Sequence, residues 1–367
     1  MNTILALDIG TEYVKAAIAR TKKTGLEIIG TGKARQAKNG TRAGAITDIA
    51  AVVASCEDAL VTAEEAAGET AKLVVVGIAG ELVKGNTTTV HYTRANANKP
   101  ITDAEMDEII KKVQQKSGDV ARKTVALETG NDNIEVRLIN SAIVSLTIDG
   151  YKISNPIGFK GSDVVIQFYT AFAPLLHVAA IEKVCAELNL ELLTIAVEPF
   201  AVCRAYLGDD TNSNFSSIMI DIGGGTTDIA VVDDGGIIGT ETFSIGANEA
   251  NTNPEIWLTG IEVALEDIEA AGTLPSNIFL CGGGADSSII QESLATSDWY
   301  KATSFSHRPL IQLITLEDIP DITFKAPAKF NRSLVTTIGL LRVGLDTLIS
   351  SPENNSLKNK LAKLLQK

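Results

Sequence analysis

The chain has 367 residues, of which 45% are hydrophobic and 21% charged, and it carries a formal net charge of −13. This length exceeds one ordinary core and suits two domains of roughly 100 to 200 residues each, and the composition excludes a disordered chain. The negative charge argues against nucleic acid as a partner, because a phosphate backbone requires a basic surface. ATP stays open as a ligand, since it needs only local hydrogen-bond donors.

The expected elements alternate between strands and helices. In chain order they are a hairpin over 3–20, a helix over 47–67, a strand over 72–80, a helix over 100–118, strands within 123–170, a helix over 175–190, a strand over 191–200 that leads into a helix near Pro199, a hairpin over 216–236, a helix over 254–272, a strand over 276–284 and a helix over 334–348. Thr102 and Glu105 predict a capping box at the start of the second helix. The alternation in both halves predicts the α/β class.

Cysteine usage and the apolar stretches indicate the compartment. The four cysteines are far apart and form no CxxC pair, so we expect buried thiols in a reducing environment and no metal site. Neither a positively charged leader nor a cleavage site is seen at the N-terminus, so no signal peptide is expected. The longest apolar stretch is broken by Pro174 and His177 and is too short to span a bilayer. A cytoplasmic protein is therefore expected.

The two hairpins have matching turns that can bind phosphate. A tight turn of glycines exposes successive backbone N–H groups, which form an anion-binding concavity. Thr11 and Thr226 add hydroxyl donors, and Asp8 and Asp221 each end a strand just before the turn. Two carboxylates that face each other across a cleft suit a hydrated Mg²⁺ bridging phosphates, because this ion keeps most of its waters. One such hairpin would be an ordinary turn, but two indicate a phosphate-binding cleft.

A third glycine cluster, residues 282–284, also follows a buried strand. With the two hairpins it resembles the actin-like ATPase superfamily, which implies duplicated ribonuclease-H-like domains. The resemblance implies that the first loop holds the β-phosphate of ATP, the second loop the γ-phosphate, and that the third approaches the adenosine. The implied nucleotide-binding residues are Gly10, Thr11, Lys15, Gly223, Gly224, Gly225, Thr226, Gly282, Gly283 and Gly284.

The same resemblance implies the catalytic and metal residues. Asp8 and Asp221 would hold Mg²⁺, mostly through water, and Glu198 matches the glutamate that positions the attacking water in chaperone relatives. These three are the candidate catalytic residues, for a weak ATPase at most. The alternative for Glu198 is an acid that begins a helix before a proline. Residues 336–341 resemble a linker whose small residues let two helices cross closely.

Four segments narrow the resemblance to the bacterial cell-division actin FtsA: 72–85, 99–110, 148–167 and 187–202. The pilus-assembly protein PilM shares this layout. The resemblance implies a first actin-like domain at 1–84 and 171–210, an inserted small α/β subdomain at 85–170, a second actin-like domain at 211–350, and a linker with a terminal helix at 351–367.

The chain departs from the family after the second hairpin. There the family inserts a further subdomain, which is reduced here to about residues 244–253. In the family that subdomain walls in the adenosine, and in FtsA it holds the C-terminal peptide of the tubulin-like protein FtsZ. The resemblance therefore carries neither tight nucleotide binding nor the FtsZ partnership over to this chain.

The C-terminal residues form a basic amphipathic pattern behind a polar linker. Leu357, Leu361, Leu364 and Leu365 fall on one helical face, and Lys358, Lys360, Lys363 and Lys367 supply the charge. Such a helix is typical of a membrane-surface anchor. The alternative is a helix that docks on its own domain or on a partner.

These inferences predict an FtsA-like adaptor or scaffold at the inner face of a bacterial membrane, with self-assembly into protofilaments as a further expectation. Nucleotide would act more as a conformational ligand than as a substrate. One alternative is a PilM-like adaptor that binds a peptide of a membrane partner beside the inserted subdomain. Another is a small-molecule kinase of the same fold, although no segment of the chain resembles its acceptor pocket.

Overall fold

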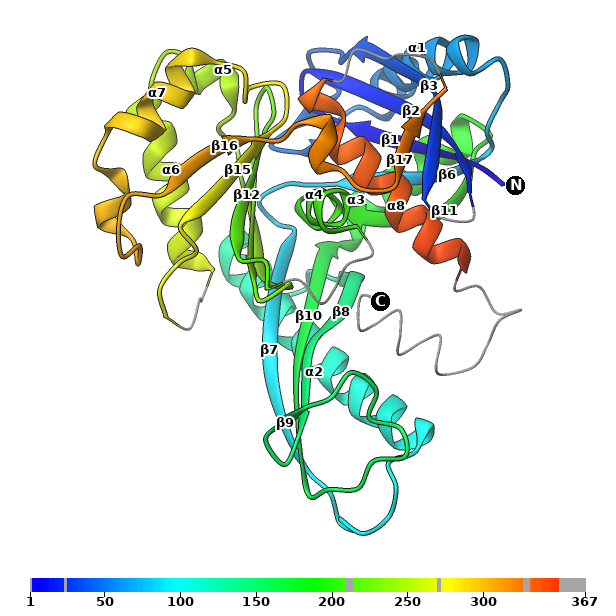
Figure 1. Ribbon diagram of the computed structural model, residues 1–367. Coiled ribbons are helices and arrows are strands. Elements are labelled where there is room, and N and C mark those ends of the chain that lie inside the picture. Colours follow the sequence, from blue (N-terminus) through cyan, green and yellow to red (C-terminus); the bar gives the residue numbers. More distant parts are fainter. Residues whose placement is uncertain (1, 23–24, 209–213, 269–271, 326–330, 350–367) are drawn as a thin grey trace.

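The computed structural model describes residues 2–22, 25–208, 214–268, 272–325 and 331–349. Figure 1 shows two α/β halves side by side, with a long narrow extension below them. In this part of the chain the strands form a six-stranded sheet, a nine-stranded sheet that runs from the second half into the extension, and a small hairpin of β4 (Thr41–Arg42) and β5 (Ala45–Ile46).

The two large sheets have a defined strand order. The six-stranded sheet runs β11 (Glu191–Val197), β6 (Leu73–Ile78), β1 (Thr3–Ile9), β2 (Tyr13–Thr21), β3 (Leu26–Arg35) and β17 (Ile322–Phe324). The nine-stranded sheet runs β16 (Leu310–Leu313), β15 (Asn277–Cys281), β12 (Ser217–Ile222), β13 (Thr227–Asp233), β14 (Gly236–Phe243), β7 (Lys84–Thr93), β10 (Asp163–Pro174), β8 (Val136–Ile148) and β9 (Tyr151–Lys152).

Each large sheet contains the same five-strand unit. In the first half, β1 is antiparallel to β2 and parallel to β6, β6 is parallel to β11, and β2 is antiparallel to β3. In the second half, β12, β13, β15, β16 and β14 repeat these relations in the same order. The repeated topology confirms the predicted α/β class, and it shows the two hairpins to be equivalent parts of the two halves.

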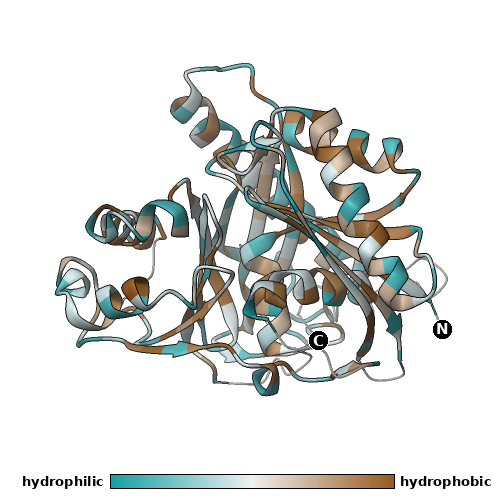
Figure 2. Cartoon of the chain, turned by 90° about the horizontal axis from the view of Figure 1, so that it is seen from above, coloured by the Kyte–Doolittle hydropathy of each residue, from teal (hydrophilic) through white to brown (hydrophobic). Residues whose placement is uncertain are grey.

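Helices cover the sheets and fill the space between the halves. They are α1 (Ile49–Ala67), α2 (Asp103–Thr129), α3 (Leu175–Glu187), α4 (Glu198–Leu207), α5 (Ala247–Ala250), α6 (Pro254–Asp267), α7 (Ser288–Thr296) and α8 (Val335–Ile349), with 3₁₀ turns at Trp299–Ala302, Leu316–Asp318 and Arg332–Leu334. Hydrophobic residues follow the inner strands and the central helices in Figure 2, and hydrophilic residues lie toward the outside.

Helices α4 and α8 cross at the centre of the molecule. Each follows the last strand of the large sheets that precedes it in the chain, β11 for α4 and β17 for α8. Every residue of α8 from Val335 to Leu345 is buried. Gly339 permits the close crossing, because a Cβ added there would lie only 1.9 Å from the carbonyl oxygen of Ala201 in α4. The small-residue linker expected at 336–341 thus lies where two helices cross closely.

The extension contains a longer helix than the sequence indicated. We expected a helix over 100–118 and strands from 123, but α2 continues to Thr129 and ends at Gly130, whose φ of 64° is left-handed. Gly118, at which the expected helix ended, is a helix-interior residue that faces the ring of Phe172; a Cβ there would lie 3.3 Å from that ring. That expectation was wrong because a packing glycine and a capping glycine look alike in sequence.

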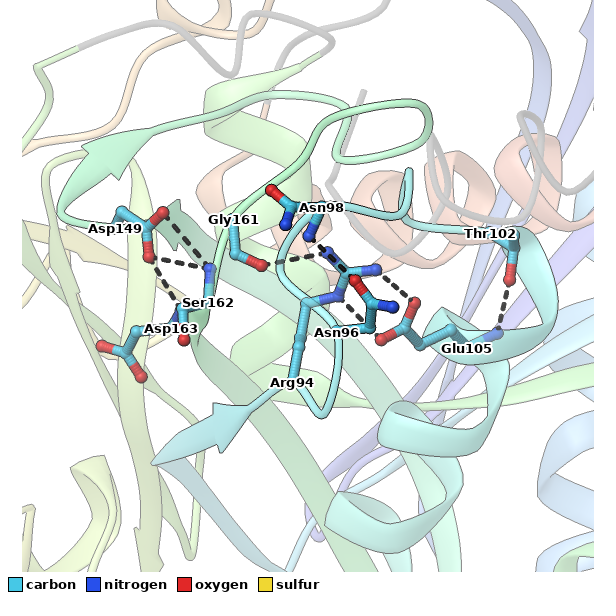
Figure 3. A network of polar contacts seen from close by, with 9 residues as sticks. All are labelled: Arg94, Asn96, Asn98, Thr102, Glu105, Asp149, Gly161, Ser162 and Asp163. Atoms are coloured by element: carbon cyan, nitrogen blue, oxygen red, sulfur yellow. Dashed lines mark hydrogen bonds and ion pairs between the residues drawn. The ribbon is translucent and has the colours of Figure 1, made fainter.

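Arg94 holds the start of α2 to the neighbouring loop (Figure 3). Thr102 caps the helix by accepting a hydrogen bond from the backbone N–H of Glu105, at 3.3 Å. The Glu105 carboxylate accepts a bidentate pair from Arg94, at 2.8 and 2.9 Å, and Arg94 also donates to the carbonyl of Gly161 at 3.0 Å. The predicted capping box is therefore present only as the Thr102 cap, because a charge-assisted bidentate bond uses the glutamate instead.

Asp149 orders the other side of the same loop. One of its carboxylate oxygens accepts hydrogen bonds from the backbone N–H groups of Ser162 and Asp163, at 3.0 and 2.8 Å. This gives a structural reason for Asp149 in the segment 148–167. Strands β7 and β10 lead into and out of the extension near residues 84 and 171, and the domain boundaries expected there stay a prediction.

Candidate functional site

The two glycine-rich turns face each other between the halves. The backbone N–H of Gly225, in the turn between β12 and β13, donates to Oγ1 of Thr11 in the turn between β1 and β2, at 2.9 Å. The second turn is closed by a hydrogen bond from Gly223 N–H to the carbonyl of Thr226, at 2.9 Å. The folding pattern of each half therefore brings two turns together that lie more than two hundred residues apart in sequence.

The third glycine loop lies directly against the second. Gly282 has a φ of +85°, and a Cβ there would lie 2.0 Å from Oδ1 of Asp221, so only glycine fits. The N–H of Gly284 donates to the carbonyl of Ile222 at 2.8 Å. Gly283 has open space around it. Its backbone is thus free to approach a ligand in the cleft.

Lys15 pairs with Asp8 at the base of this cleft. The distance between Nζ of Lys15 and Oδ2 of Asp8 is 2.7 Å, and the two side chains are 14% and 3% exposed. They are opposite each other in the β1–β2 register, which fixes their relative position. Burial alone would lower the pKa of Lys15, but the carboxylates of Asp8, Asp221 and Glu198 together raise it. Lys15 is therefore a fixed positive charge.

Three further carboxylates lie around this lysine. Asp221 accepts a hydrogen bond from Thr336 of α8, Asp228 accepts one from Thr242 at 2.6 Å, and Glu198 begins α4. Burial is the main cause of a raised pKa in all three, and mutual repulsion adds to it; the pKa of Asp228 rises to about 8. These carboxyl groups therefore tend to hold protons unless a further cation binds beside them.

A divalent cation with bound phosphates would relieve that repulsion. In the described part of the chain, no group of three or more His, Cys, Asp or Glu side chains could hold a metal ion directly. The donor set nevertheless fits Mg²⁺, because Asp8 and Asp221 can bind waters of a hydrated ion whose remaining ligands come from phosphate.

The cleft itself has a volume of about 160 Å³. Of the residues predicted from the sequence, those that line it are Asp8, Gly10, Thr11, Lys15, Glu198, Asp221, Gly223, Gly224, Thr226, Gly283 and Gly284. Gly225 contacts Thr11 and Gly282 contacts Asp221, so both shape the loops. The leucines and lysines of 357–367 lie outside the described residues.

Sequence reasoning missed several residues of the cleft. Lys33 lies opposite Lys15 in the β2–β3 register, and its Nζ lies 3.8 Å from the centre of the Tyr13 ring. Glu12 reaches across to Gly224, where a Cβ would lie 2.6 Å from its carboxylate. Only the pairing of β2 with β3 places Lys33 in the cleft, so no local sequence motif predicts its position.

Glu198 also lines a second, smaller cavity of about 30 Å³. This volume has room for about one water molecule. His177 of α3 lines the same cavity, and its buried Nδ1 has no hydrogen-bond partner among the described residues. Glu198 therefore lines both the cleft and this small cavity, and His177 is a further residue of the cavity that the sequence did not reveal.

Known proteins are similar to this chain in architecture and in sequence. No family model matches the chain. The chain is 27% identical over 229 residues to the cell division protein FtsA of Streptococcus pneumoniae, an alignment that covers 62% of this chain and 46% of that protein. It is also 27% identical over 265 residues to FtsA of Enterococcus faecalis, covering 68% and 56%. The chain is FtsA-like, with an actin-like fold.

The chain spans about half the length of the FtsA proteins that it matches. A solved structure of similar fold is the PilM–PilN type IV pilus biogenesis complex, with a TM-score of 0.64, 14% identity, and coverage of 93% of this chain and 98% of that one. The resemblance to FtsA and the actin-like fold inferred from the glycine loops are thereby confirmed. The roles of individual site residues stay predictions.

Proposed function

We propose that the protein is an FtsA-like adaptor of bacterial cell division or morphogenesis that binds Mg-ATP between its two phosphate loops. The observation that carries this proposal is the joining of the two turns around the Lys15–Asp8 pair, with the third glycine loop beside them. Backbone N–H groups and one fixed cation at the end of buried strands suit a polyphosphate. Bound Mg²⁺ would supply positive charge that balances the buried carboxylates.

Nucleotide binding should be weak. Between β14 and α6 only the four-residue helix α5 occurs, where the family has a further subdomain that covers the adenosine. The cleft of about 160 Å³ is also smaller than typical ligand pockets of 300 to 1,000 Å³. Phosphates therefore have a defined site and the adenosine has little to pack against. Nucleotide would act as a conformational ligand with slow hydrolysis.

Titration calorimetry of the full chain tests this part of the proposal. With Mg²⁺ present, the dissociation constant for ATP should lie between about 1 μM and 1 mM, which corresponds to about 8 to 4 kcal/mol of binding free energy. With EDTA in place of Mg²⁺, binding should weaken at least tenfold, because the carboxylates then repel the phosphates. A submicromolar dissociation constant would contradict the argument that the adenosine lacks a covering subdomain. The absence of any binding heat at millimolar Mg-ATP would contradict a functional nucleotide site.

We further propose that residues 357–367 attach the protein to anionic membranes at the inner face of the cell envelope. The support is their sequence, which has four leucines on one helical face and four lysines without an acid. Each fully buried leucine contributes on the order of 1.5 to 3 kcal/mol at most, and each lysine near an anionic surface about 1 kcal/mol. Among the described residues no helix is long and apolar enough to cross a bilayer.

One copy of such a helix binds weakly, because ordering a short helix and repulsion from an acidic body oppose it. Several copies side by side would bind far more strongly, since each bound copy raises the effective concentration of the next. Membrane attachment and self-assembly would therefore support each other. We propose assembly into protofilaments for this reason, and we propose no FtsZ contact.

A PilM-like adaptor is the second candidate, and one surface favours it. A hollow of about 510 Å³ lies between β8 of the extension and the first half, where α3 and β11 form its other side. Leu138, Leu190 and Leu193 line it together with the charged Arg137 and Glu182. Apolar side chains with a few charges suit a short peptide. A native pull-down that recovers pilus components would favour this function over cell division.

A further inference from the structure

Helix α6 has apolar side chains on two faces. One face, which includes Trp257 and Ile261, is buried in the core of the second half. On the other face, Ile256 is 53% and Val263 is 51% exposed, and Gly260 lies between them at helical spacing. A surface helix usually has a single apolar stripe toward its own core. The outer stripe of α6 is therefore available to a partner.

This outer stripe forms one wall of a hollow of about 520 Å³, which we call the α6 hollow. Its other apolar side chains come from the end of β14 and the turn after it, Phe243 and Ile245. The ring of Phe243 packs on Gly260, where a Cβ would lie 2.6 Å from Cε2 of the ring. The hollow is thus a formed apolar surface, large enough for several side chains of one partner helix.

The edge of the α6 hollow is acidic. Four carboxylates and one amine line it, namely those of Glu81, Glu128, Glu241, Asp267 and Lys84. Lys84 already pairs with Glu128 at 3.3 Å and with Glu241 at 3.1 Å. The charged groups together leave an excess of three carboxylates over amines. An apolar partner with positive charges along its sides is complementary to this surface.

The chain itself contains a segment of that chemistry. Residues 357–367 have four leucines at helical spacing and four lysines, with no acidic residue, and as a helix they would be about 16 Å long. Seven residues, 350–356, separate this segment from α8 and can reach about 24 Å when fully extended. In Figure 1, α6 lies at the left of the molecule, and α8 runs from the centre toward the right, away from α6. A second copy is therefore better placed to supply the segment.

We propose that residues 357–367 of one copy dock as a helix in the α6 hollow of a second copy. The leucines would pack on Ile256, Val263 and Phe243, and the lysines would face the acidic edge. A docked segment cannot insert its leucines into a membrane at the same time. Docking would then compete with the membrane attachment proposed above, and only this consequence rests on the proposed function.

Disulfide trapping tests the contact directly. All four native cysteines are buried, so new surface cysteines can be probed in the full chain. A mixture of Val263→Cys and Leu361→Cys chains, oxidised under mild conditions, should give a cross-linked dimer whose 263–361 peptide is identified by mass spectrometry. The matched control is Leu176→Cys, since Leu176 is 78% exposed on α3 outside the hollow. Cross-linking of 361 to 176 as fast as to 263 would overturn the proposal.

Sedimentation analysis gives an independent readout. Self-association of the full chain should weaken at least tenfold in Val263→Lys, and high salt should weaken it in the wild-type chain. Association of Val263→Lys equal to that of the wild type would contradict the proposal. Vesicle binding by Val263→Lys should stay at or above the wild-type level, because the variant frees the tail for the membrane and leaves protofilament contacts outside the α6 hollow unchanged. Vesicle binding that does not depend on the tail would contradict the membrane proposal. Absence of the 263–361 cross-link would contradict the docking proposal, so the two failures are distinguishable.

Discussion

Lys15→Met should lower the free energy of unfolding by about 3 to 5 kcal/mol at neutral pH, and it should abolish detectable ATP binding. The reason is that Asp8, 2.7 Å from Lys15 Nζ and 3% exposed, would be left as an uncompensated buried charge. Asp221, Asp228 and Glu198 lie near the same point, and each would lose the favourable interaction with the Lys15 charge. Chemical denaturation and calorimetry of the full chain would measure the two effects.

Lys33→Met is the matched control for this substitution. Lys33 is the register partner of Lys15 on the next strand and lines the same cleft, but its side chain is exposed. Its loss should change stability by less than about 0.5 kcal/mol, as for most surface sites. In acid the deficit of Lys15→Met should shrink, because protonation removes the carboxylate charges. Equal stability of both variants at neutral pH would disprove the role given to the Lys15–Asp8 pair.

Glu198→Gln should reduce any ATP hydrolysis at least 100-fold and leave Mg-ATP affinity within about twofold. A water-orienting carboxylate acts mainly in the transition state, so its loss lowers turnover and spares ground-state binding. Glu12→Gln is the control, because Glu12 also lines the cleft but reaches toward Gly224. Phosphate release and calorimetry measure the two quantities. Unchanged hydrolysis in Glu198→Gln would leave Glu198 as a residue that only begins α4.

The pH dependence of hydrolysis provides a second readout for Glu198. Burial, with repulsion from Asp8, Asp228 and Asp221, raises the pKa of Glu198 well above that of an ordinary carboxyl group. If the carboxylate is the active form, the rate should rise with pH through a midpoint above the usual carboxyl range. Bound Mg²⁺ should move that midpoint down, because added positive charge favours the carboxylate. A rate that falls as pH rises through this range would contradict the assignment.

The features that the sequence did predict are those written in local patterns. Apolar runs around Asp8 and Asp221 are followed by one glycine and by three glycines, a pattern that predicts hairpins with tight turns, and both hairpins form in the expected residues. The repetition of this pattern indicated a duplicated fold. The close helix crossing at Gly339 was implied by the resemblance of residues 336–341 to a linker of the family, and the structure places such a crossing there.

The features that the sequence did not predict depend on contacts between residues that are far apart in the chain. Gly118 looks like a helix end until Phe172 is placed beside it, and Glu105 looks like a capping residue until Arg94 is seen to bind it. Lys33 enters the cleft only through the pairing of β2 with β3, and His177 shares a cavity with Glu198 only because α3 packs against α1 and β5. Each needs a contact between distant segments, which no local pattern encodes.

The adaptor account depends on residues 357–367 holding the protein on a membrane, and co-sedimentation with vesicles tests this most directly. The full chain, a truncation after Ser351, Leu361→Glu and the control Leu176→Glu would each be mixed with neutral and anionic vesicles. Leu176 is an exposed leucine of α3, so its replacement adds the same charge outside the tail segment.

We predict that the full chain and Leu176→Glu sediment with vesicles in proportion to anionic lipid content, and that salt weakens this binding. The truncated chain and Leu361→Glu should stay in the supernatant at every lipid composition. If the truncated chain sediments as well as the full chain, residues 357–367 are not the anchor and the account of a membrane-attached adaptor is wrong.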